Sequence, residues 1–310
     1  MRLRTIENNL TPLVLAAAAA GLLVPALGVA LRPAVTPLLA LLMFCVSLTF
    51  DLATLRRVLT RPGVQALATF LVYGPMSLAG FLLGRLAFGV GPFALGFALV
   101  GALPTDVSSP LLVLIARGNV ALATVLNAVN TALAPVLVPA IFLAYTGVDL
   151  QVPVAPLILE LALVVLAPTA CGVALRTWRP GRVAPLEPVA SATASLAYLA
   201  LVLAVVGPNA GMILARPAMV AGAVGVALLL NGTGYLLGWA AGRRLPASAD
   251  RTALLFTVSK KEFSIAAFMV FASGLPPEVA LPAVVYAVVQ MVTSPLVATR
   301  LARRAREAGT

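Results

Sequence analysis

Three adjacent charged residues, Lys260, Lys261 and Glu262, interrupt an apolar stretch that is long enough to cross a membrane. The apolar runs ALLFTV before them and SIAAFMVF after them place the charges near the middle of the bilayer. A further carboxylate, Asp106, lies in the polar stretch LPTDVSSP of another apolar segment. Ionisable side chains at this depth cost several kcal/mol unless they face water or a partner, and they are typical of ion and solute pathways.

The composition indicates whether the chain folds in water or in a membrane. Of its residues 61% are hydrophobic and 10% are charged, the mean hydropathy is +1.06, and a soluble domain has about 25% charged residues. These values predict a polytopic membrane protein in a lipid bilayer. The net charge of +11 is not accompanied by basic runs with interleaved aromatic residues, so we expect no nucleic-acid partner. Two cysteines in apolar runs and the absence of histidine give no metal-ligand pattern, and we expect no cofactor.

The apolar segments indicate the topology. Arg32, Arg85 and Arg216 fall outside if the N-terminus is cytoplasmic, and every other arginine falls inside. We therefore expect both termini in the cytoplasm of a cell whose inner membrane holds the protein. Gly232 and Gly234 indicate close packing of the eighth segment on a neighbour. At roughly 20 residues for a crossing, the ten predicted segments are 11–30, 34–50, 63–88, 92–116, 119–144, 154–175, 188–207, 217–242, 250–273 and 277–300.

An internal repeat relates the two halves of the chain. Residues 119–137 resemble 278–296: Val-Ala-Leu occurs near the start of both stretches and a proline near the end of both. In the same frame the polar interruption at Asp106 matches the one at Lys260. Five crossings in each half would invert the second half in the membrane, as in many secondary transporters. The predicted inverted repeats are residues 1–150 and 151–310.

Both interrupted segments are expected to break. Pro104 and Pro110 remove backbone hydrogen bonds and clash with the preceding turn. On a continuous helix Lys260 and Lys261 would point about 100 degrees apart, and a break lets both face inward. Unwound backbone at membrane depth is tolerated only where it is buried in protein or lines a water-filled cavity. Two breaks related by an inverted repeat would cross near the bilayer centre and form an ion and substrate site.

The interrupted segments resemble those of the bile acid:sodium symporter superfamily. The stretches that carry the resemblance are LPTDVSSPLLVLIARGNVALATVLNAVNTALAPVLVP for crossings four and five, and SKKEFSIAAFMVFASG with PAVVYAVVQMVTSPLVAT for crossings nine and ten. The resemblance implies an all-α fold of ten helices, with a core of helices 3–5 and 8–10 and a panel of helices 1, 2, 6 and 7. It also implies a substrate cavity between core and panel, with Gln290 at a substrate-lining position.

The chain departs from the sodium-coupled members at their ion-binding positions. Those members have Ser-Asn after the first break, where this chain has Ser109 and Pro110, and an acidic residue before the second break, where this chain has Val258. With fewer oxygen ligands and two added ammonium groups, we expect a lysine in place of sodium, neutralised by Asp106 and Glu262. Desolvation favours the neutral form of a lysine, which makes proton coupling or uncoupled exchange reasonable. Sodium coupling remains an alternative.

The candidate site residues are polar side chains of segments four, five, nine and ten. Each has a structural alternative: Asp106 could cap the half-helix that follows it, the charged triplet could snorkel to an interface, and the amides and hydroxyls could join helices. The substrate- and ion-binding candidates are Thr105, Asp106, Ser108, Ser109, Asn127, Asn130, Thr131, Lys260, Lys261, Glu262, Ser264 and Gln290.

These features predict a secondary transporter that moves a small organic anion by alternating access and does not need sodium. The anion preference follows from the two ammonium groups and from helix N-termini expected to point at the site. The alternatives are a sodium-coupled symporter of the same superfamily, a channel, and an intramembrane enzyme that uses Asp106 and Glu262 as an acid pair. The enzyme is disfavoured because the sequence shows no nucleophile with a base. We expect a monomer or a homodimer.

Overall fold

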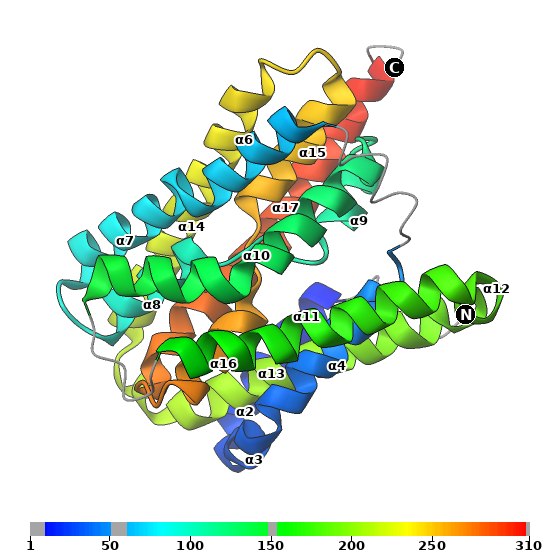
Figure 1. Ribbon diagram of the computed structural model, residues 1–310. Coiled ribbons are helices and arrows are strands. Elements are labelled where there is room, and N and C mark those ends of the chain that lie inside the picture. Colours follow the sequence, from blue (N-terminus) through cyan, green and yellow to red (C-terminus); the bar gives the residue numbers. More distant parts are fainter. Residues whose placement is uncertain (1–9, 51–60, 148–153, 308–310) are drawn as a thin grey trace.

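A computed structural model describes residues 10–50, 61–147 and 154–307, and every regular element in these ranges is a helix (Figure 1). The predicted boundary between the halves, at residues 150 and 151, lies outside the described residues. The same holds for Arg2, Arg4, Arg56 and Arg57, which contributed to the predicted orientation.

The described part of the chain has seven helices that are long and apolar enough to cross a membrane, so the protein is polytopic. The prediction of an all-α membrane protein is confirmed, and the count of ten crossings stays a prediction. Two shorter apolar helices are Pro12–Leu23 and Pro92–Ala102. Some of these seven long spans consist of consecutive helical elements joined by a short turn. The spans are Pro25–Ser47, Pro62–Phe88, Val120–Thr146, Ala155–Trp178, Pro180–Ala215, Pro217–Gly242 and Pro277–Ala305.

The helices form two groups, which are in contact with each other: α10 packs against α11, and α16 lies beside α11 and α13 (Figure 1). In the first group, here called the outer group, α13 packs against α2, α3 and α4, and α11 packs against α4. Short helical turns join some of these helices and carry a proline at one of their first two positions. Proline is tolerated there because the first N–H groups of a helix have no partner within the helix. The outer group comprises α2 (Leu10–Leu23), α3 (Pro25–Leu31), η1 (Arg32–Ala34), α4 (Val35–Ser47), α11 (Val154–Trp178), α12 (Pro180–Val183), η2 (Ala184–Leu186) and α13 (Glu187–Ala215).

The second group, here called the break group, contains both interrupted segments. Its main contacts are α7 on α8, α14 on α15 and α17, and α10 on α8 and α15. It comprises α6 (Pro62–Tyr73), α7 (Pro75–Phe88), α8 (Pro92–Ala102), α9 (Ser109–Ile115), α10 (Val120–Thr146), α14 (Pro217–Gly242), α15 (Ser248–Ser259), α16 (Phe263–Ala272), η3 (Pro277–Ala280) and α17 (Leu281–Glu307).

The predicted third segment is divided in two. Helix α6 ends at Tyr73, Gly74 follows with φ −94° and ψ −91°, and α7 begins at Pro75. A proline inside an apolar run disrupts the helix before it, and this signal was present in the sequence. The division leaves carbonyl groups at the end of α6 without the N–H donors of a continuous helix.

Glycines bring the helices of the break group close to the interruptions. A Cβ atom added to Gly80 of α7 would lie 2.7 Å from the Cα of Gly101 on α8. A Cβ atom added to Gly234 of α14 would lie 2.6 Å from the Cα of Ser259, the last residue of α15. Close packing was predicted at Gly232 as well, but there the added atom would meet nothing within 4 Å, so that prediction is wrong.

Gly234→Ala should therefore lower the free energy of unfolding by about 1–3 kcal/mol, because an overpacked contact against main-chain atoms can relax only by moving a helix. Gly232→Ala is the matched control on the same helix and should be neutral or slightly stabilising, since alanine is the better helix former. Thermal unfolding in detergent would compare the two variants. Equal unfolding temperatures for both would contradict the close contact of α14 with the end of α15.

Candidate functional site

The two predicted breaks are present. Between α8 and α9 the residues 103–108 are not helical, and between α15 and α16 the residues 260–262 are not helical. Leu103 and Lys260 both have extended backbone, with ψ angles of 151° and 139°. The charged triplet is nevertheless buried, since Lys260 and Lys261 are 2% and 1% exposed.

The two unwound stretches are hydrogen-bonded to each other. The N–H of Glu262 donates to the carbonyl of Pro104 at 3.0 Å, and the N–H of Asp106 donates to the carbonyl of Lys260 at 3.4 Å. This pairing is antiparallel, like a two-residue ladder between strands. The breaks therefore supply donors and acceptors to each other, which lowers the cost of placing unwound backbone among apolar helices.

Lys261 binds the ends of two helices. Its ammonium nitrogen donates to the carbonyl oxygens of Val72, Gly101 and Leu103, each at 2.9 Å. The first carbonyl belongs to the last turn of α6 and the other two to the end of α8, where helical carbonyls have no partner within the helix. An ammonium has three donors and no acceptor, so this arrangement uses its full hydrogen-bonding capacity. Lys261 forms no ion pair among the residues described.

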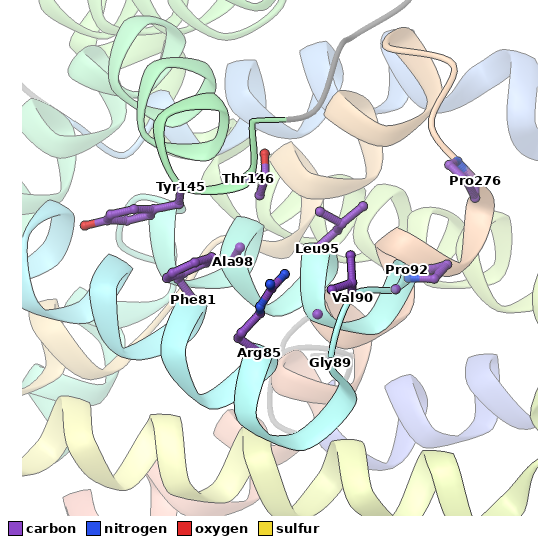
Figure 2. Close-up of a pocket in the computed structure, with 12 residues that line it drawn as sticks. Phe81, Arg85, Gly89, Val90, Pro92, Leu95, Ala98, Tyr145, Thr146 and Pro276 are labelled. Carbon is purple, nitrogen blue, oxygen red and sulfur yellow. The ribbon is translucent and has the colours of Figure 1, made fainter.

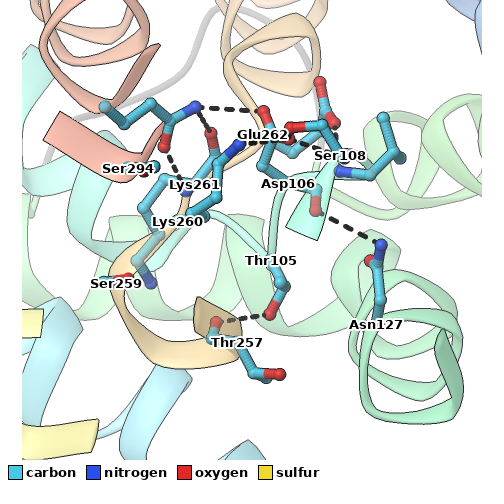
Figure 3. A network of polar contacts seen from close by, with 12 residues as sticks. Thr105, Asp106, Ser108, Asn127, Thr257, Ser259, Lys260, Lys261, Glu262 and Ser294 are labelled. Atoms are coloured by element: carbon cyan, nitrogen blue, oxygen red, sulfur yellow. Dashed lines mark hydrogen bonds and ion pairs between the residues drawn. The ribbon is translucent and has the colours of Figure 1, made fainter. Parts of the chain in front are cut away.

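Lys260 makes a different set of contacts. Its ammonium lies 3.2 Å from Oδ1 of Asp106 and donates to the hydroxyl of Ser108. Oδ1 of Asp106 also accepts from the hydroxyl and from the N–H of Ser108, the latter at 2.7 Å. Oδ2 accepts from the amide of Gln290 at 3.0 Å (Figure 3). The buried charges are thus paired and hydrogen-bonded, which is what makes such a pair tolerable at this depth.

Glu262 caps α16. Its Oε1 accepts from the hydroxyl of Ser264 at 2.5 Å and from its N–H at 3.3 Å, and Oε2 accepts from the N–H of Val107 at 3.1 Å. A carboxylate at this position also opposes the positive end of the helix dipole. The predicted pairing of Glu262 with a lysine is not seen in the described part of the chain, and the α16 cap takes its place.

Gln290 of α17 holds the backbone of the second break. Its Oε1 accepts from the N–H of Lys261 at 2.9 Å, and its Nε2 donates to the carbonyl of the same residue at 3.0 Å. The resemblance implied that Gln290 lines the substrate cavity, but its side chain is fully buried and does not line the cavity described below. Its contacts fix the direction in which the two adjacent lysines point.

Helix α10 supports the first break with the three predicted residues of one face. Asn127 donates to the carbonyl of Asp106 at 3.3 Å, and Thr131 donates to Oδ1 of Asn127 at 3.1 Å. Asn130 donates at 3.2 Å to the hydroxyl of Thr105, which itself donates to the carbonyl of Thr257 at 2.8 Å. Ser109, the remaining candidate, is buried, and its hydroxyl has no hydrogen-bond partner among the described residues.

The site contains an asparagine, Asn231, that the sequence analysis did not single out. Asn231 of α14 donates to the carbonyl of Ser259 at 2.9 Å and accepts from Thr293 at 2.7 Å. Tyr286 of α17 donates to the same Ser259 carbonyl at 2.7 Å, which completes the end of α15. An asparagine within the apolar run GVALLLNGTG was the available signal for the first of these contacts.

A cavity of about 370 Å³ lies between the outer group and the first break. Of the twelve candidate residues, Asp106 and Ser108 line it, and the other ten do not. The opposite wall is formed by α4 and α13. The lining residues are Leu42, Cys45, Val46, Thr49, Phe50, Asp106, Val107, Ser108, Pro110, Leu111, Leu114, Val120, Thr124, Ser191, Ala194, Ser195, Tyr198 and Met291.

A second cavity, of about 330 Å³, lies between α7, α8 and the end of α10 (Figure 2). Arg85 contributes its charge, and Phe81 stacks on Tyr145 with ring centroids 5.1 Å apart. None of the predicted site residues lines this cavity. The cavity beside Asp106 is therefore the candidate site, because it alone of the two adjoins the buried charges.

Comparison with known proteins relates most of the chain to membrane transporters. The "Uncharacterized sodium-dependent transporter YocS" of Bacillus subtilis (strain 168) is 25% identical over 277 residues, which are 88% of this chain and 84% of that protein. The "Probable sodium/metabolite cotransporter BASS1, chloroplastic" of Oryza sativa subsp. japonica is 29% identical over 203 residues, which are 66% of this chain and 49% of that protein. The profile of the Sodium Bile acid symporter family matches residues 36–216. This chain therefore belongs to the Sodium Bile acid symporter family, and it is a multi-pass membrane transporter of a small organic substrate rather than an enzyme.

Proposed function

We propose that this protein is a secondary transporter that moves a small organic anion by alternating access, with the ammonium of Lys261 in place of a coupling cation. The observation that carries the proposal is the binding of this ammonium by three main-chain carbonyls. Carbonyl oxygens that converge at the ends of helices are typical ligands of monovalent cations in transporters with broken helices. Here a cation that is covalently part of the chain occupies them.

A tethered ammonium changes the energetics of the transport cycle. A bound sodium ion can leave when the site opens, and its departure removes the positive charge. Lys261 cannot leave, so the carbonyls of Val72, Gly101 and Leu103 keep their partner at every sodium concentration. Sodium could enter this position only by displacing the ammonium of Lys261, a residue that is 1% exposed. The contacts support transport that is independent of sodium.

The proposed architecture is the one expected from the sequence: inverted repeats 1–150 and 151–310, a core that corresponds to the break group, and a panel that corresponds to the outer group. The antiparallel pairing of the two breaks supports it, since an inverted repeat brings equivalent breaks together in opposite directions. The cavity beside Asp106 separates α9 and α10 from α4 and α13, so movement of one group against the other would change its access.

The preference for an anion is supported by the position of Lys260. The Lys260 ammonium donates a hydrogen bond to the hydroxyl of Ser108. Ser108 lines the cavity and Lys260 does not, so the ammonium lies directly behind the cavity wall. A carboxylate that reaches Ser108 from the cavity would meet a wall with a positive charge behind it. Asp106 pairs with the same ammonium and also lines the cavity. Proton coupling stays a variant of this proposal.

The relatives favour a second candidate, because the names of the B. subtilis and rice proteins specify sodium. Reconstituted protein should distinguish the two. We expect saturable uptake of a labelled carboxylate that is unchanged when sodium is replaced by choline, and thermal stabilisation by members of a panel of carboxylates, sulfonates and sterol conjugates. Measurements across pH would detect proton coupling. Uptake that requires sodium would show that the ammonium does not replace the coupling ion.

A further inference from the structure

The second cavity, of about 330 Å³, has no part in the proposed transport (Figure 2). It lies within the break group, between α7, α8 and the end of α10. Phe81 and Tyr145 form an aromatic wall, in which the two rings are stacked with an interplanar angle of 15°. Val90 and Leu95 extend the apolar lining, and of the described residues that line the cavity Arg85 alone carries a charge. The cavity therefore combines an apolar wall with one cation.

The side chain of Arg85 extends into this cavity (Figure 2). Its guanidinium makes no hydrogen bond or ion pair within the described part of the chain. Other arginines do have protein partners: Arg61 and Arg176 pair with carboxylates, and Arg251 donates to main-chain carbonyls before α15. A guanidinium has five N–H donors and keeps its charge in proteins. Arg85 thus presents a permanent cation with unused donors to the cavity.

Apolar side chains are exposed beside Arg85. Leu86, the next residue, is 83% exposed, and Val90, which lines the cavity, is 82% exposed. In a membrane protein such side chains are stable where acyl chains cover them. Arg85 belongs to the last turn of α7, and an arginine near the end of a membrane helix extends its charge to the level of the lipid head groups. The cavity therefore adjoins both parts of a lipid.

A phospholipid fits these features better than a free anion does. Its phosphodiester can accept two parallel hydrogen bonds from the guanidinium of Arg85, and its glycerol backbone can lie against the rings of Phe81 and Tyr145. The acyl chains can follow Leu86 and Val90 into the bilayer. A free phosphate would leave the apolar wall without a partner. Basic pockets between membrane helices are established sites for lipid head groups.

The lining also indicates the charge of the head group. The described residues that line the cavity include no carboxylate, so the ammonium of a zwitterionic lipid would have no charged partner there. We propose that this cavity binds an anionic phospholipid, whose phosphodiester accepts hydrogen bonds from the guanidinium of Arg85. The site is separate from the cavity beside Asp106 and does not depend on the nature of the transported solute.

Arg85→Gln tests the proposal in the full-length protein purified in detergent. The probes are phosphatidylglycerol, which is anionic, and phosphatidylethanolamine, which is zwitterionic, with the same acyl chains. Native mass spectrometry measures the lipid bound at each concentration. We expect the wild type to bind phosphatidylglycerol more tightly than phosphatidylethanolamine. In Arg85→Gln the affinity for phosphatidylglycerol should fall by about tenfold, the effect of one hydrogen bond to a charged group.

Arg216→Gln is the matched control. Arg216 is exposed, is expected on the same membrane face as Arg85, and does not line the cavity. This variant loses the same charge and should keep the wild-type affinity for phosphatidylglycerol. Without added lipid, Arg85→Gln should unfold at the temperature of the wild type, because the lost guanidinium makes no bond within the described protein.

Four outcomes would overturn the proposal. Equal affinity of phosphatidylglycerol for the wild type and Arg85→Gln would remove Arg85 as a lipid ligand. An equal loss in Arg216→Gln would show that the net charge of +11, rather than the cavity, attracts the lipid. Equal affinity of the wild type for both lipids would contradict the anionic head group. Thermal stabilisation by sodium phosphate in the wild type and not in Arg85→Gln would assign the cavity to a soluble anion. None of these results bears on carboxylate uptake, which tests the proposed function separately.

Discussion

Lys261→Ala should unfold at a markedly lower temperature than the wild type and should regain part of that stability in sodium chloride. The substitution leaves the carbonyls of Val72, Gly101 and Leu103 without their donor. Each buried carbonyl that loses its partner costs about 1–3 kcal/mol. It also leaves a space lined by three oxygens, into which a small cation can enter. A ligand that binds only the folded state raises its stability by mass action.

Lys261→Met is the matched control for this effect. It removes the same charge and the same three hydrogen bonds, but the methionine side chain fills the space with apolar atoms of similar length. We expect a comparable loss of stability without recovery in sodium. Thermal unfolding of the wild type and both variants in sodium chloride and in choline chloride would measure the difference. An equal response of both variants to sodium would indicate a general salt effect and contradict the replacement of a cation by Lys261.

The breaks could be predicted because their causes are local. Pro104 and Pro110 disrupt a helix wherever they stand, and two adjacent lysines cannot both face inward from a continuous one. Which of the two lysines pairs with Asp106 and which binds the helix ends could not be predicted, because these contacts join distant elements. The carbonyl of Val72 is available only because α6 ends before Gly74, and the third segment was predicted as one continuous crossing.

Tyr198 could not be recognised from the sequence for a similar reason. In the run ASLAYLALV a tyrosine has the appearance of an ordinary core residue. Its place in the cavity wall depends on how α13 packs against the break group, which the run does not show. The resemblance directed attention to Gln290 as a residue that lines the cavity, and the structure places it behind the wall, on the backbone of Lys261.

The pair formed by Lys260 and Asp106 should show strong coupling in a double-mutant cycle. Lys260→Met leaves a buried carboxylate without its cation, and Asp106→Asn leaves a buried ammonium without its carboxylate. Removal of one partner of a buried pair costs about 3–5 kcal/mol, whereas replacement of both partners is often close to neutral. We therefore expect both single variants to be strongly destabilised and the double variant to unfold nearer to the wild type.

The partly exposed pair of Arg176 and Glu187 provides the control for this cycle. Its charged atoms are 2.5 Å apart, but the side chains are 22% and 38% exposed, and such pairs contribute about 0–1 kcal/mol. Glu187→Gln should therefore change the unfolding temperature little. Uptake assays on the Lys260 and Asp106 variants add a second readout: the double variant should be folded and inactive, because the neutral pair no longer places a positive charge behind Ser108. A folded double variant with wild-type uptake would restrict the buried pair to a structural role, and additive losses of stability in the cycle would show that the two charges do not depend on each other.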